Sequence, residues 1–150
     1  MSITLENLDE YSQRFAKMLF EIHPEWWALA TVESRTESNL GYLSIVVPSP
    51  SHPDSQLWIT TDGTEVRIAF DYWHMHLGDW LGGEEREWFL EALENIEDIL
   101  SEKMIIAVSM NGDQLCGSTN IKPGEIPKLI KGSRTYVRSW LGTYNAEYQH

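Results

Sequence analysis

The stretch QLWITTDGTEVRIAFDYWHMHL, from Gln56 to Leu77, decides the fold that the sequence predicts. Its residues are rich in β-branched and aromatic types, which favour strands. The Asp62-Gly63 pair interrupts them and supplies the positive φ angles that a tight hairpin turn needs. We therefore expect a β-hairpin whose second strand runs without a break from Glu65 to Leu77.

Turn signals and apolar spacing outline the elements on either side of this hairpin. Asn7 and Glu10 resemble a capping box and begin a helix that ends before Pro24. The other expected elements are the paired strands WWALATVES and LGYLSIVVPS, the helix EEREWFLEALENIEDILSE, a hairpin of KMIIAVSM and QLCGSTNIK around Asn111-Gly112, and a last strand TYVRSWLGTY. The sequence thus predicts one α+β domain over residues 1–150, with a largely antiparallel sheet of about six to seven strands and two main helices.

The sole cysteine, Cys116, cannot form an internal disulfide bond, which fits a reducing compartment. We expect it to be a small buried side chain. The opening residues MSITLENLDE lack the pattern of a secretory signal, and no apolar run approaches the ~20 residues of a membrane span. These features predict a soluble cytoplasmic protein.

The net charge of −12 is distributed unevenly along the chain. From Asp79 to Glu102 there are nine acidic residues and one basic residue, whereas from Ile121 to Trp140 there are five basic residues and one acidic residue. A protein with this charge repels nucleic acid and anionic membranes and attracts basic partners. We therefore expect a protein partner with a basic surface, no nucleic-acid partner and no membrane partner.

Two histidines at alternate positions raise the question of a metal site. On a strand, His74 and His76 share one face with Phe70, and Asp79 follows the strand as a third potential ligand. No other residue has a spacing that completes a ligand set. A polar or partner-binding role is the preferred interpretation, and a small metal-binding protein or metal-dependent enzyme using these three residues is the alternative.

Signatures of catalysis are missing from the sequence. There is no G-x-S-x-G elbow, and Cys116 lacks the surroundings of a reactive thiol. Gly82-Gly83 is followed by acidic residues, which oppose a bound phosphate. We therefore expect no catalytic residues and no cofactor.

Aromatic side chains among charges favour a recognition role. Trp73 and Trp80 bracket the two histidines just before the acidic helix, and tryptophan is a common anchor of protein interfaces. A tryptophan taken alone is expected to be buried, so we expect Trp58, Trp88 and Trp140 in the core, and burial is the alternative for Trp73 and Trp80. A solvated surface is the alternative for the polar face of the helix. The predicted partner-binding residues are Trp73, His74, His76, Asp79, Trp80, Glu84, Glu85, Glu87 and Glu91.

The run ITTDGTEVRIAFDYWHMHLGDW, the acidic helix after it and the later TYVRSWLGTYNAEY together resemble a known class of protein. They are similar to small cytoplasmic immunity proteins of bacterial polymorphic toxin and contact-dependent growth inhibition systems. The resemblance extends over roughly the C-terminal two thirds of the chain and is one of pattern. It implies a non-catalytic protein that binds one toxin domain, often a nuclease, and neutralises it inside the producing cell. A general interaction module without a toxin is a further alternative.

Overall fold

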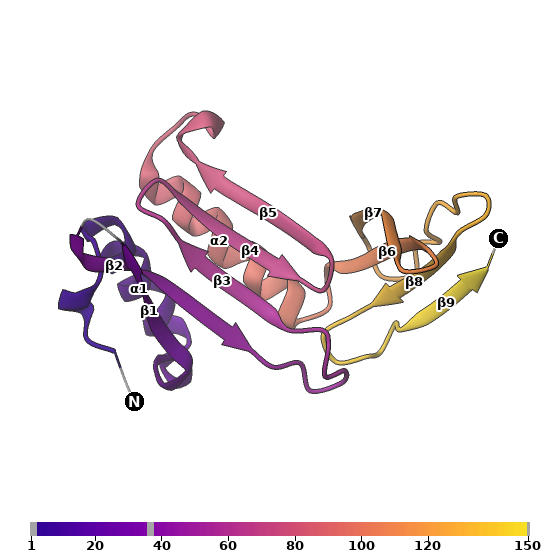
Figure 1. The fold of residues 1–150 in the computed structure, drawn as a ribbon, viewed down its shortest axis with the longest axis horizontal. Helices are drawn as coiled ribbons and strands as arrows, with labels where there is room; N and C mark the ends of the chain where they lie inside the picture. The colour runs from indigo at the N-terminus through magenta and orange to yellow at the C-terminus, as the bar shows by residue number, and fades with distance from the viewer. Residues whose placement is uncertain (1–2, 36–37, 150) are drawn as a thin grey trace. The chain divides into compact units, whose positions relative to one another are not determined.

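The computed structural model describes residues 3–35 and 38–149. The chain divides into two compact units, each built from several segments. The first comprises Met1–Val47, Leu57–Ala69 and His74–Glu94, and the second comprises Pro48–Gln56, Phe70–Trp73 and Asn95–His150. The strands form two sheets, ordered β1-β2-β3-β4-β5 and β7-β6-β8-β9 (Figure 1).

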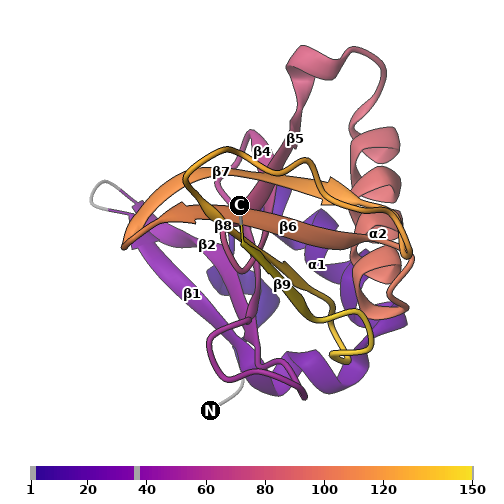
Figure 2. The ribbon, with the colours of Figure 1, turned by 90° about the vertical axis from the view of Figure 1, so that its right-hand side faces the viewer.

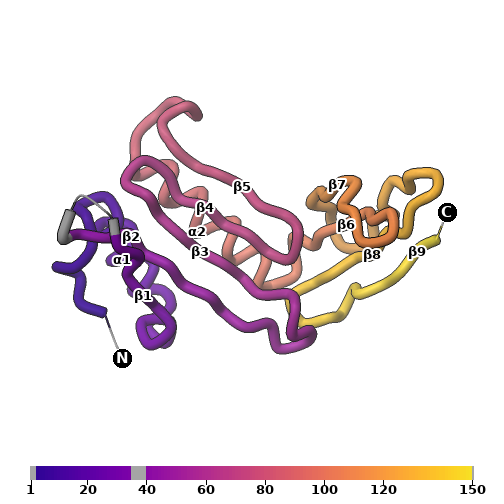
Figure 3. The backbone as a smooth tube through the Cα atoms, in the orientation of Figure 1, coloured from indigo at the N-terminus to yellow at the C-terminus, as the bar shows by residue number. Residues whose placement is uncertain are grey.

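Helices and a five-stranded sheet make up the first unit. Its elements are the 3₁₀ turn Leu5–Asn7, α1 (Glu10–Ile22), the 3₁₀ helix Pro24–Leu29, β1 (Ala30–Arg35), β2 (Ser38–Val47), β3 (Leu57–Thr61), most of β4 (Glu65–Phe70) and β5 (Trp73–Gly78), the 3₁₀ turn Asp79–Leu81 and the first part of α2 (Glu85–Leu100). The end of β4, the start of β5 and the turn between them, Phe70–Trp73, belong to the second unit. Strands β1 and β2 pair antiparallel, as do β2 and β3. Short connections join β3 to β4 and β4 to β5, so the chain reverses twice here (Figure 3).

One face of this sheet is buried under the helices. Residues at alternate strand positions supply the apolar contacts, namely Leu43, Ile45, Val47, Leu57, Ile59, Val66, Ile68 and Leu77. The hydroxyl groups of Ser12 on α1 and Thr61 on β3 form a buried hydrogen bond of 2.5 Å. The Phe89 ring of α2 packs edge-on against Tyr11 and Phe15 of α1. Figure 1 shows the part of α2 that belongs to this unit behind strands β3, β4 and β5, and no helix among the described residues of the unit lies on their opposite face.

The second unit is built on a four-stranded antiparallel sheet (Figure 2). Its strands are β6 (Ile105–Asn111), β7 (Gln114–Ile121), β8 (Arg134–Arg138) and β9 (Ala146–Gln149). Ile105, Ala107 and Val137 form a buried cluster, and Tyr148 packs against it. The segment before β3 belongs to this unit, because the hydroxyl groups of Ser49 and Ser51 donate to the carbonyl oxygen of Trp140.

The α+β class, the antiparallel pairing and the two main helices are confirmed. The described residues form nine strands in two sheets, where the sequence predicted about six to seven strands in one sheet. The largest addition is β9, in the polar segment after the last predicted strand. The residues Trp26 and Trp27, predicted to begin a strand, lie in a 3₁₀ helix instead.

The prediction of an unbroken strand from Glu65 to Leu77 was wrong. The chain turns at Asp71 and Tyr72, and Asp71 has a φ angle of +56°. After a two-residue turn, each residue of the following strand points to the face opposite to the one it would have in an unbroken strand. His74 and His76 therefore lie on the face opposite the buried Phe70.

Three predictions about single residues were also wrong. Asp9, not Asn7, caps α1, and its carboxylate accepts a hydrogen bond of 2.7 Å from the Ser12 amide. Cys116 is exposed on β7, since that strand lies at a sheet edge. Trp58 is 49% exposed, because its side chain projects from the uncovered face of β3.

The β6–β7 hairpin provides a test of its turn. Gly112 has a φ angle of +62° and open space around its Cα, so a valine there meets only backbone strain. We expect Gly112→Val to lower the free energy of unfolding by about 1–2 kcal/mol in urea denaturation. Gly117, in β7, also has open space but no positive φ angle. Equal destabilisation by Gly117→Val would show that the loss at Gly112 does not come from the turn.

Candidate partner-binding surfaces

The uncovered face of the five-stranded sheet carries polar and aromatic side chains. In β3, Trp58 and Thr60 alternate with buried Leu57, Ile59 and Thr61. Arg67 on β4 and His74 on β5 are exposed on this same face. Register brings Glu33 of β1 opposite Tyr42 of β2. The pleat of the sheet thus gathers side chains from distant parts of the chain on one surface.

A groove of about 320 Å³ lies on this face. We call it the outer-sheet groove and define it by Glu33, Tyr42, Trp58, Asp62, Glu65 and Arg67, with Thr60, Thr61 and Ala69 completing its lining. Among the described lining residues, Tyr42 and Trp58 are aromatic, three are acidic and one is basic. The groove is therefore negatively charged and bordered by flat rings.

The two histidines line a shallower hollow beside this groove, together with Arg67 and Ala69. The Nδ1 atom of His76 lies 3.0 Å from the Oε1 atom of Glu65, within hydrogen-bond distance. The ring centroids of His74 and His76 are 5.2 Å apart with an edge-on geometry. A carboxylate from the neighbouring strand thus orients His76, while His74 is exposed.

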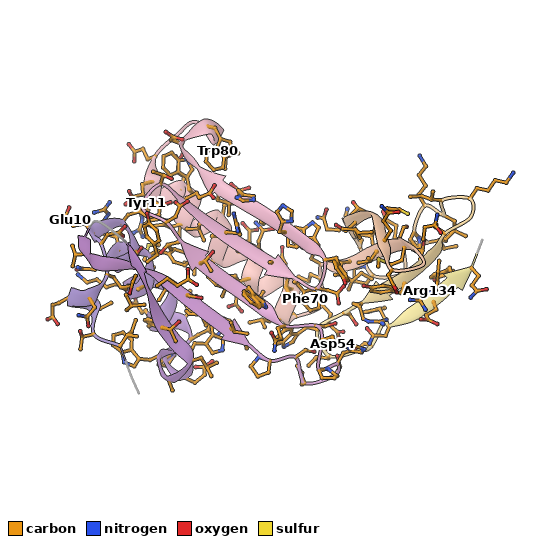
Figure 4. All side chains as sticks on the ribbon, viewed as in Figure 1. Glu10, Tyr11, Asp54, Phe70, Trp80 and Arg134 are labelled. Carbon is orange, nitrogen blue, oxygen red and sulfur yellow. The ribbon has the colours of Figure 1, made fainter. Side chains whose placement is uncertain are left out.

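The connection between β5 and α2 forms a second exposed surface, which we call the acidic corner. It comprises Asp79, Trp80, Leu81, Glu84, Glu87 and Glu91. Trp80 is 56% exposed. Figure 4 shows its side chain beyond the end of β5, where the chain turns towards α2. Its ring lies over Gly78, where an added Cβ atom would be 2.5 Å from the Trp80 Cζ3 atom. Gly78 thus lets a large aromatic side chain rest on the backbone of β5.

The acids at the start of α2 differ in their surroundings. Glu85 pairs with Arg14 of α1 through contacts of 2.5 and 3.0 Å, and this hydrogen bonding raises the pKa of Arg14. The Glu87 carboxylate accepts a hydrogen bond of 3.1 Å from the amide of Glu84. The side chains of Glu84 and Glu91 are exposed. Glu84, Glu87 and Glu91 therefore lie at the surface, whereas Glu85 is held against Arg14 of α1.

The structure divides the predicted partner-binding residues among three environments. His74 and His76 lie on the uncovered sheet face, and Asp79, Trp80 and the glutamates lie at the acidic corner and on α2. Trp73 is only 9% exposed, so little of its side chain is accessible to a partner, contrary to the exposed anchor that the sequence suggested. The turn at Asp71 explains this burial, because it directs alternate β5 residues into the core.

A metal site at the histidines requires a third ligand nearby. Within residues 3–35 and 38–149, no group of three or more histidine, cysteine, aspartate or glutamate residues is placed to hold a metal ion. Asp79 therefore does not complete a ligand set with His74 and His76. The two histidines remain polar residues of the exposed sheet face.

Sequence reasoning missed the residues of the outer-sheet groove. One local signal was present, because the alternation in LWITT places Trp58 opposite the buried Leu57 and Ile59. The contribution of Glu33 and Tyr42 had no comparable signal, since it depends on how β1 and β2 pair.

Comparison with known proteins adds no relative to this description. The chain matches no protein-family model, no curated protein and no solved structure. Within the part of the chain that the structure describes, no helix has the length and apolar character needed to cross a membrane.

Proposed function

We propose that this chain is a non-catalytic immunity protein that binds and neutralises a cognate toxin in the cytoplasm of the producing cell. The observation that carries the proposal is the exposed Trp80 side chain at the acidic corner. An exposed indole beside carboxylates combines an apolar anchor with charge, as the centre and rim of a protein interface do.

The proposed mechanism is occlusion of a basic surface on the toxin. A nuclease toxin fits this mechanism, because nucleases hold phosphate groups with lysine and arginine side chains. The chain's net charge of −12 accelerates its encounter with such a surface. Trp80 then fills an apolar depression while Glu84 and Glu91 meet basic side chains.

Capture of a partner from the native cell with the full-length chain, followed by mass spectrometry, identifies the toxin.

Raising the salt concentration from about 50 to about 500 mM shortens the Debye length from ~14 to ~4 Å and is expected to slow association. Combining Glu84→Lys with Glu91→Lys is expected to weaken toxin binding by roughly tenfold or more, and Trp80→Ala to do the same through lost burial. Surface plasmon resonance measures both effects.

Glu6 and Glu21 provide matched controls, because both are exposed glutamates outside the acidic corner. Reversing both to lysine changes the net charge equally and is expected to leave dissociation unchanged. If the reversals at Glu6 and Glu21 weaken toxin binding as much as those at Glu84 and Glu91, the weaker binding comes from net charge alone. If neither Trp80→Ala nor the reversal of Glu84 and Glu91 changes toxin binding or cell survival, the proposed contact is wrong.

A further inference from the structure

The outer-sheet groove has the chemistry of a site for a flat cation. We propose that it binds an arginine side chain presented by a protein partner. Its aromatic walls come from Tyr42 on β2 and Trp58 on β3, while carboxylates come from β1, β4 and the turn between β3 and β4. This inference goes beyond the toxin-binding role, because it concerns a different surface and is testable with a free ligand.

Charge selects a cation for this groove. Among the described lining residues, Glu33, Asp62 and Glu65 are acidic and Arg67 is basic. The Glu65 carboxylate lies 3.0 Å from His76, and the Asp62 carboxylate accepts hydrogen bonds from the amides of Thr64 and Glu65, so Glu33 is the acid on which the proposal depends most. An anionic ligand would have to approach three carboxylates, whereas a cation gains their attraction. The same balance argues against nucleic acid, whose phosphates would lie against these side chains.

The aromatic walls select the shape of the cation. Trp58 is 49% exposed, so part of its indole is accessible to a ligand. Antiparallel pairing sets Glu33 directly opposite Tyr42, and such pairs have Cβ atoms about 5 Å apart. A guanidinium group is planar, so it stacks on a ring while its edge donates two hydrogen bonds to a carboxylate. A lysine ammonium group cannot make both contacts in this way.

The size of the groove fits one side chain. Its volume of about 320 Å³ is at the lower limit for small-molecule pockets, which span roughly 300 to 1,000 Å³. The groove lies on the exposed face of a sheet, so the polypeptide that carries the arginine has room to pass above it. A protein loop or terminus is therefore a suitable source of the side chain.

The test uses the full-length chain and N-acetyl-arginine amide as the probe. In two-dimensional NMR, titration through the millimolar range should shift the Trp58 indole resonance and the backbone amides of β2, β3 and β4 in a saturable manner. N-acetyl-citrulline amide has the same shape without the charge and should bind roughly tenfold or more weakly. N-acetyl-lysine amide should also bind more weakly than the arginine probe.

Variants locate the binding within the groove. Trp58→Leu and Glu33→Gln should each weaken arginine binding roughly fivefold or more. Both residues are exposed, so circular dichroism should show an unchanged fold. Trp80→Leu is the matched control, because it removes an exposed tryptophan from the acidic corner and should leave arginine binding unchanged. Citrulline binding as strong as arginine binding, unchanged binding in both groove variants, or no saturable shift would overturn the proposal. None of these results depends on a toxin, so a failure here leaves the toxin-binding proposal separately testable.

Discussion

Replacement of Asp71 by alanine is expected to lower the free energy of unfolding by about 3 kcal/mol. The Oδ1 atom of Asp71 accepts a hydrogen bond of 2.9 Å from the Ser55 hydroxyl. Its Oδ2 atom accepts bonds of 3.0 Å from the Tyr72 amide and 2.9 Å from the Tyr136 hydroxyl. Tyr136 is only 7% exposed and this hydrogen bond is part-buried, so removing Asp71 leaves the Tyr136 hydroxyl without its protein partner. The positive φ angle of Asp71 adds strain for alanine.

Urea denaturation of Asp71→Ala measures this loss. Asp54 is the matched control, because it is an exposed aspartate in the same unit, and Asp54→Ala should change stability by less than about 0.5 kcal/mol. A double-mutant cycle with Tyr136→Phe should give a coupling energy of about 1 kcal/mol or more. Asp71→Ala no more destabilising than Asp54→Ala would contradict the proposed role of Asp71 in holding the turn.

Burial raises the pKa of Tyr136, and the negative charge of Asp71 raises it further. Asp71→Asn removes this charge while keeping a side chain that tolerates a positive φ angle. The pKa of Tyr136 should therefore fall in this variant, which absorbance titration of the tyrosines detects.

Asp71 also shows why part of the fold could not be predicted from the sequence. The turns at Gly63 and Gly112 and the apolar stripe of α2 are local patterns, and the structure contains them. The run AFDYWH has no glycine or proline, so it is typical of a continuous strand. Its turn is stabilised by Ser55 and Tyr136, which lie 16 and 65 residues away in the sequence. A local pattern cannot contain such partners.

The candidate surfaces, like the fold, were only partly predictable from local sequence. The exposure of Trp80 and the alternation of His74 with His76 follow from the sequence around them. The burial of Trp73 depended on the unpredicted turn. The outer-sheet groove required the pairing of β1 with β2 and of β2 with β3, which single-strand patterns do not specify. Local sequence thus indicated where polar side chains project, but not which strands bring them together.

Glu102 provides the second large effect, and replacing it with alanine is expected to cost about 3 kcal/mol at neutral pH. Its carboxylate, on a residue only 7% exposed, accepts hydrogen bonds of 3.2 Å from the amides of Leu141 and Thr143. The Thr143 hydroxyl donates to it as well, at 2.6 Å. Removing the carboxylate leaves the two backbone amides without this partner, and the segment between β8 and β9 loses its link to the end of α2.

These contacts also predict how the effect depends on pH. Burial alone would raise the pKa of Glu102, but hydrogen bonds from Ser139, Thr143 and Leu141 outweigh it and hold the pKa below the ordinary 4.5. A carboxyl group whose pKa is lower in the folded state contributes its full stabilisation above the unfolded value. That contribution is lost as the pH falls below 4.5 and through the folded-state pKa.

The measurement compares the wild-type chain with Glu102→Gln, which keeps the shape of the side chain but not its charge. Urea unfolding from pH 7 to pH 3 should show a constant difference above about pH 4.5 and a shrinking one below it. Glu94→Gln is the matched control, because it makes the same substitution at an exposed glutamate of α2. The absence of a difference between the wild-type chain and Glu102→Gln at pH 7, or a difference that persists unchanged to pH 3, would contradict a stabilising role for the charge of Glu102.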